Sequence, residues 1–85
     1  MAPNETDISA ALIHYITSEL IGDPSMTLGA DDDLLATEFV DSLGVMRLIS
    51  FMEREFEITV APEHVTIEHF GTVKAMSAYV QVQGN

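Results

Sequence analysis

Apolar residues recur at helical spacing along this chain, and that periodicity constrains its fold more than any other feature. In the first such segment they begin at Ile8 and continue at offsets of 3, 4, 7, 8 and 12 residues, which is one helical stripe. The chain has no cysteine, so packing of the stripes must supply the stability without disulfides. Its 85 residues are too few for two hydrophobic cores. The sequence therefore predicts one all-α domain over residues 1–85, with its core at about 7–82.

Four helices are expected, three main ones and one short one, as a small four-helix bundle. Thr6 or Asp7 can cap the first, and Gly22 can end it in a left-handed conformation. Thr72 can cap the last. The predicted helices cover residues 7–21, 42–56, 67–70 and 72–81.

The apolar residues of segment 25–41 show no regular periodicity, so this segment is predicted to form a long loop between the first two helices. A loop of this length is uncommon in a small domain unless it has a function or its apolar residues enter the core. The expected anchors are Leu28, Leu34, Leu35 and Phe39.

The second predicted helix carries two apolar stripes. A broad stripe faces the core, and a narrower ridge made of Leu43, Met46 and Ser50 lies beside it. A helix in so small a domain rarely buries more than one broad face, so we expect part of the ridge to be exposed. Exposed apolar residues rimmed by charge indicate a docking site. The residues of the broad stripe are Val45, Leu48, Ile49, Met52 and Phe56.

The chain is strongly acidic, with 14 Asp and Glu against 3 Lys and Arg and a formal net charge of −11. Long-range repulsion excludes binding to nucleic acid or to an anionic membrane surface, and it favours basic partners. Acidity does not mean disorder here, because 47% of the residues are hydrophobic and the mean hydropathy is +0.21.

The N-terminal segment has neither the basic start nor the apolar run of a targeting peptide, and no stretch is long enough for a membrane span. We therefore expect a cytoplasmic monomer. Because the chain begins at Met1 and has little outside the predicted core, we also expect a discrete protein rather than an excised module.

Metal sites are not expected. Asp31–Asp33 is the densest acidic cluster, but an EF-hand loop starting at Asp31 would have Ala36 where Gly is needed and Ser42 where Glu is needed. His64 and His69 are five residues apart, which does not match the spacing of a helical ligand pair.

A serine hydrolase is also excluded, because Val40-Asp41-Ser42-Leu43-Gly44 lacks the first Gly of the nucleophile elbow. The purely structural interpretation of this pentapeptide is helix capping, for which Asp and Ser are preferred residues. The functional interpretation is that Ser42 lies at the positive end of a helix dipole, where a bound or covalently attached phosphate is favoured. Both interpretations fit the same geometry.

Asp41-Ser42-Leu43 after a long loop, followed by a helix ending in Phe51-Met52-Glu53-Arg54-Glu55-Phe56, resembles the acyl carrier protein family. The likeness runs from the first helix to the end of the chain. It implies that Ser42 carries covalent 4′-phosphopantetheine, added from coenzyme A by a phosphopantetheinyl transferase, and that Asp41 assists this modification. It also implies a carrier that is not itself an enzyme. Acyl-loading and acyl-processing enzymes would then contact Leu43, Met46 and Glu53.

This chain departs from the family pattern at three positions. Arg47 and Arg54 interrupt an otherwise negative outward face of the second helix, and Gly44 replaces a more usual polar residue. We expect both arginines to take part in partner binding. The departures favour a dedicated polyketide or aminoacyl carrier of secondary metabolism over a carrier for fatty-acid synthesis. A small acidic helical adaptor with no prosthetic group remains the alternative, since it would share the same composition.

Overall fold

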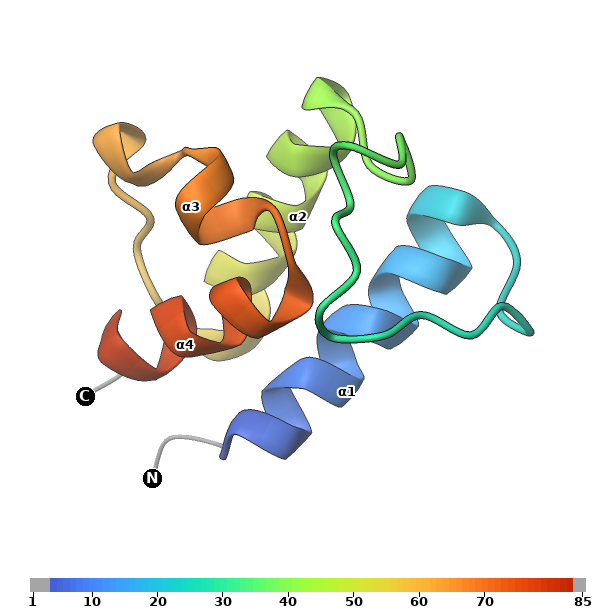
Figure 1. The fold of residues 1–85 in the computed structure, drawn as a ribbon. Coiled ribbons are helices and arrows are strands. Elements are labelled where there is room, and N and C mark those ends of the chain that lie inside the picture. The colour runs from blue at the N-terminus through green and yellow to red at the C-terminus, as the bar shows by residue number, and fades with distance from the viewer. Residues whose placement is uncertain (1–3, 84–85) are drawn as a thin grey trace.

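The computed structural model describes residues 4–83, and every regular element within them is a helix (Figure 1). The all-α prediction, with three main helices and one short one, is confirmed. A π-helical extension, η1 (Ile16–Ile21), follows the first helix, and a 3₁₀ turn, η2 (Pro62–His64), precedes the third. The four α-helices are α1 (Glu5–Tyr15), α2 (Ser42–Phe56), α3 (Ile67–Phe70) and α4 (Val73–Gln83).

The first helix begins two residues earlier than predicted. Asn4 is its N-cap, and the Asn4 side chain accepts a hydrogen bond of 2.8 Å from the backbone N–H of Asp7. The prediction that Thr6 or Asp7 is the cap was therefore wrong, because Asn caps as well as Asp does and lies upstream. The other end was predicted correctly, since η1 stops at Gly22 with a left-handed φ of 82°.

The later helices lie close to their predicted bounds. α2 covers the predicted residues and ends where Glu57 adopts a left-handed φ of 55°. Thr72 caps α4 as expected, its hydroxyl oxygen accepting a hydrogen bond of 3.0 Å from the N–H of Ala75. α4 continues to Gln83, two residues beyond the predicted end.

The core brings the helices and the loop together. α1 packs against α4, and α3 also packs against α4. Ser77 of α4 is fully buried, and its hydroxyl lies 2.8 Å from that of Ser9 on α1. The buried apolar residues from the four α-helices are Ile8, Leu12, Val45, Leu48, Ile49, Met52, Phe70, Val73, Met76, Tyr79 and Val80.

The long loop forms backbone hydrogen bonds with the end of α3 and the start of α4. Leu28 and Leu34 are buried, as predicted, whereas Leu35 and Phe39 are only half-buried. The N–H of Leu34 donates to the carbonyl of Gly71 at 2.8 Å, and the N–H of Lys74 donates to the carbonyl of Ala30 at 2.9 Å. Figure 1 shows the loop in green as it passes the start of α4. These contacts fix the direction from which the chain enters α2.

Candidate functional site

The N-terminus of α2 presents an exposed serine on a firmly capped turn. Asp41 is the N-cap, and its Oδ1 accepts a hydrogen bond of 2.7 Å from the N–H of Gly44. Ser42 is the first helical residue and is exposed. The first N–H groups of a helix have no intrahelical acceptor and carry partial positive charge. A negative group attached to Ser42 would therefore lie at a favourable helix end.

Gly44 packs closely behind this turn. It is buried, and a Cβ atom added to it would lie 3.0 Å from Cγ1 of Val40 and 3.7 Å from Cδ1 of Leu20. The first of these distances is shorter than ordinary van der Waals contact. The small residue after Asp41-Ser42-Leu43 thus has a local packing reason.

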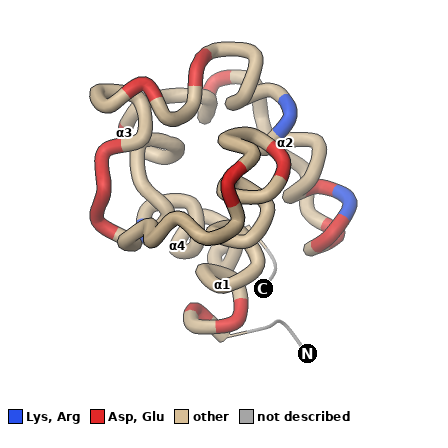
Figure 2. Tube along the Cα trace, turned by 90° about the vertical axis from the view of Figure 1, so that its right-hand side faces the viewer, with Lys and Arg blue, Asp and Glu red and all other residues tan. Residues whose placement is uncertain are grey.

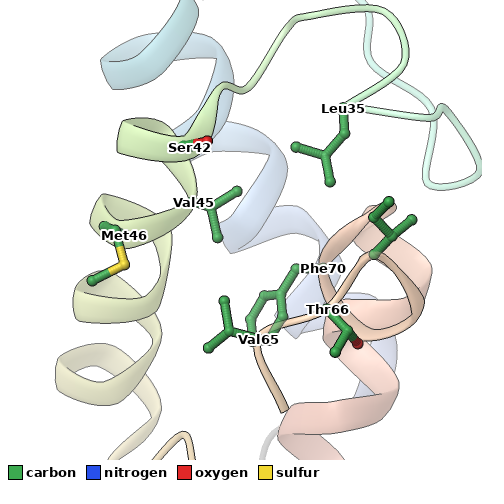
Figure 3. A pocket seen from close by; sticks show the side chains of 8 residues that line it. Leu35, Ser42, Val45, Met46, Val65, Thr66 and Phe70 are labelled. Carbon is green, nitrogen blue, oxygen red and sulfur yellow. The ribbon is translucent and has the colours of Figure 1, made fainter. Parts of the chain in front are cut away.

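A largely apolar pocket of about 320 Å³ opens beside Ser42, between α2 and α3. In Figure 3, Ser42 lies at the upper end of α2 with Leu35 across from it, and Phe70 lies lower down between the two sides. Ile67, on the far wall, is 71% exposed although it is aliphatic. The remaining lining residues are Val45, Met46, Val65 and Thr66.

The predicted second ridge of α2 is exposed, as expected. Leu43 is 73% exposed and Met46 is 59% exposed, and Ser50 is exposed as well. Arg47 and Arg54 are exposed on the same helix. Ser42 is thus bordered by an apolar pocket and by the exposed ridge, and two arginines are exposed on the same helix.

The sequence of this chain matches a known family over most of its length. Residues 11–80 match the family model described as "Phosphopantetheine attachment site". The chain belongs to the phosphopantetheine-attachment family. It is also 24% identical over 74 residues to a protein of Serratia sp. (strain ATCC 39006) named "Probable acyl carrier protein PigG". That alignment covers 87% of this chain and 85% of the relative, and the predicted resemblance to acyl carrier proteins is confirmed.

Sequence reasoning missed one side of the site of this phosphopantetheine-attachment protein. The wall of the pocket that faces Ser42 is built by Val65, Thr66, Ile67 and Phe70, none of which was predicted as a site residue. One signal was available, because Val65 and Ile67 are apolar residues outside the main helical stripes. Their position opposite Ser42 follows only from the fold.

Glu53 has an intramolecular contact that the sequence did not indicate. Its Oε2 accepts a hydrogen bond of 3.0 Å from the N–H of Val60, and the residue is half-buried. Glu53 therefore ties the segment after α2 back to the helix. The expectation that it also contacts partner enzymes stays a prediction.

The two histidines considered as ligands pack on α4 and do not line the pocket beside Ser42. His64 Nδ1 lies 2.9 Å from the hydroxyl of Tyr79, and the His69 ring centroid lies 5.1 Å from that of Tyr79. Both histidines are half-buried, whereas His14 is exposed. Among residues 4–83, no group of three or more His, Asp or Glu side chains is placed to hold a metal ion. No helix in this described part is long and apolar enough to cross a membrane.

Proposed function

We propose that this chain is an acyl carrier protein whose Ser42 bears a covalent 4′-phosphopantetheine arm. The observation that carries the proposal is the exposed hydroxyl of Ser42 on the first turn of α2, between the Asp41 cap and an apolar pocket. The family match over residues 11–80 supports it. In this function the domain, with its core at about residues 7–82, is a carrier and not a catalyst.

The residues present fit this prosthetic group. An exposed hydroxyl is accessible to a transferase, and the helix N-terminus stabilises the negative charge of a phosphodiester. When bound, the arm supplies the thiol that this cysteine-free chain lacks. In the attachment step, Ser42 Oγ would give its proton to a base of the transferase and bond to the β-phosphorus of coenzyme A. The diphosphate bond breaks, and adenosine 3′,5′-bisphosphate leaves.

The pocket beside Ser42 suits an apolar cargo. Its volume of about 320 Å³ is at the lower end of the range for small-molecule sites. Phe70 and Val45 give it an apolar interior, and the exposed Ile67 extends that surface outward. We propose that a short acyl chain or part of the arm rests against this apolar surface between transfers.

We further propose that the cargo is an acyl or aminoacyl thioester of a polyketide or related secondary pathway, handled by a cytoplasmic monomer. Arg47 and Arg54 support this choice over fatty-acid synthesis, whereas Gly44 no longer does, because its packing against Val40 explains it. Mass analysis of the thioester carried in the native host tests the pathway. A fatty-acid intermediate as the main cargo would contradict it.

The first prediction concerns Ser42. Incubation with coenzyme A and a broad-specificity phosphopantetheinyl transferase should add the mass of one phosphopantetheine group to the wild-type protein. Ser42→Ala should abolish the gain, because its side chain has no oxygen to attack phosphorus. Ser25→Ala is the control, since Ser25 is also exposed but lies outside α2 and its ridge, and it should be modified fully. Intact mass spectrometry measures the mass gain of the wild type and of both variants.

Two outcomes would contradict the proposal. Absence of any mass gain in the wild type would favour the small acidic adaptor, which needs no prosthetic group. A gain that persists in Ser42→Ala would place the attachment at a different residue.

A further inference from the structure

The outward face of α2 carries two basic residues in an otherwise acidic chain, with the exposed Glu55 next to the second of them. Arg47 is the only charged residue in the first eleven positions of the helix, residues 42–52, and Arg54 lies two turns farther on. These are two of the three Lys and Arg in a chain with 14 acidic residues. Figure 2 shows the two basic positions along α2. Both arginines are exposed, whereas Glu53 between them is held by the N–H of Val60.

The two arginines border an open hollow of about 310 Å³ on this face. Its lining includes Tyr15 at the end of α1 and Phe51 of α2, whose rings stack with centroids 4.2 Å apart. Leu43 and Met46 line it as well, and both are mostly exposed. The hollow thus offers aromatic and aliphatic surface next to two guanidinium groups.

Helix geometry places the arginines on one line. They are seven residues apart, which is about 10 Å along the axis and nearly two full turns. Arg47 also lines a neighbouring hollow together with Glu38 and Asp41, so it marks the border between the acidic loop and the cationic face. Beyond that border, the residues of α2 that line the hollow are apolar or basic except for Ser50, and none of them is acidic.

We infer that the α2 face docks an enzyme surface that inserts an apolar side chain into this hollow and presents carboxylates to Arg47 and Arg54. The inference rests on the proposed carrier function, because such an enzyme would act on the arm at Ser42. Charge complementarity requires that the docked patch of the partner is acidic. A basic partner would meet two guanidinium groups on this face and would bind the acidic loop instead. Arg also forms bidentate pairs with carboxylates, which fixes the orientation of the docked surface.

The net charge of −11 does not prevent this interaction. At 0.15 M salt the Debye length is about 8 Å, so most of the distant acidic residues are screened. The charged residues that line the hollow itself are the two arginines, so they dominate the electrostatics of contacts within it. The partner surface needs only a local acidic patch and not an acidic protein.

The second prediction uses two synthetic helical peptides on the apo protein. One presents Leu and Phe on a single face with two Glu seven residues apart, and its twin has Lys in place of Glu. In ¹⁵N NMR titrations at 0.15 M salt, the Glu peptide should shift the amides of residues 43–54 and should bind at least fivefold more tightly than the Lys peptide. Arg47→Glu and Arg54→Glu should each weaken its binding about three- to tenfold.

Lys74→Glu is the matched control, because Lys74 is exposed on α4 and the substitution changes the net charge equally. It should leave the affinity for the Glu peptide within twofold. Equal loss in all three variants, tighter binding of the Lys peptide to residues 43–54, or binding of neither peptide would overturn the inference. Mass gain at Ser42 is measured on the same variants, so failure of the carrier function is distinguished from failure of the docking surface.

Discussion

At the scale of single residues, Asp41 has a capping role in the structure and a second, proposed role that can be separated from it. Its Oδ1 accepts the hydrogen bond from Gly44 N–H at 2.7 Å, which fixes the first turn of α2 and so the position of Ser42. The resemblance to acyl carrier proteins implies a second role, in which the carboxylate charge assists modification. An Asn side chain can cap a helix but carries no charge, so the two roles respond differently to substitution.

The third prediction therefore compares Asp41→Ala with Asp41→Asn. The Ala variant should lower the free energy of unfolding by about 1 kcal/mol because the cap is lost. The Asn variant should retain more than half of that stability. If the charge assists the transferase, both variants should be modified more slowly than wild type. Urea unfolding followed by circular dichroism and the rate of mass gain at Ser42 measure the two effects.

Equal destabilisation of the two variants would contradict the capping role, since Asn keeps an acceptor oxygen. Modification of both variants at the wild-type rate would contradict the assisting role and would leave Asp41 as a cap alone.

At the scale of elements, local signals account for what the sequence predicted well. Asp41 and Ser42 mark the start of α2, and Gly22 marks the end of η1, because capping and left-handed turns depend on a few neighbouring atoms. The start of α1 was predicted less well, since Asn4 competes with two other capping residues nearby. The π-helical hydrogen bonding of η1 has no marker in the sequence.

The site was predicted only in part, because local signals reveal some of its residues and tertiary packing supplies the others. Ser42 and the exposed ridge with Leu43 and Met46 follow from motif and periodicity within one helix. The pocket wall at Ile67 does not, because it is brought to Ser42 by the loop and by the packing of α3 on α4. Contacts between residues so far apart in the chain depend on the tertiary structure, which local propensity does not encode.

The fourth prediction tests the junction that holds α3 and the loop in place. A Cβ added to Gly71 would lie 2.6 Å from the backbone carbonyl oxygen of Ile67, and the Gly71 carbonyl accepts the N–H of Leu34. Gly71→Ala should therefore destabilise the fold by about 1–3 kcal/mol through overpacking. Gly29→Ala is the control, because its added Cβ would make only an ordinary contact of 3.4 Å with Asp32.

Thermal and urea unfolding measure the Gly71 effect, and Gly29→Ala should stay within about 0.5 kcal/mol of wild type. A Gly71→Ala variant as stable as wild type would mean that the α3–α4 junction is not tightly packed. The pocket beside Ser42 would then have an adaptable wall.

At the scale of the whole molecule, the charges are distributed unevenly. Asp31–Asp33, Glu38 and Asp41 precede Ser42, whereas Arg47 is the only charged residue in the first eleven positions of α2. Attachment of a phosphodiester at Ser42 adds one more negative charge at the border of the two regions. A basic transferase and an enzyme with an acidic patch can therefore approach the same serine by different surfaces.

The fifth prediction follows from the net charge of −11 on 85 residues. Self-repulsion destabilises a compact acidic chain, and salt screens it. Raising sodium chloride from 20 mM to 500 mM should therefore raise Tm, since each ~1 kcal/mol of relieved repulsion adds about 4–8 °C for a domain of this size. Lys74→Glu should show a larger rise than wild type, because it adds negative charge without touching the core. Thermal unfolding followed by circular dichroism at the two sodium chloride concentrations measures the rise in Tm for both proteins. A Tm that falls with salt would mean that favourable ion pairs outweigh repulsion, and the acidity would then contribute to the stability of the fold rather than oppose it.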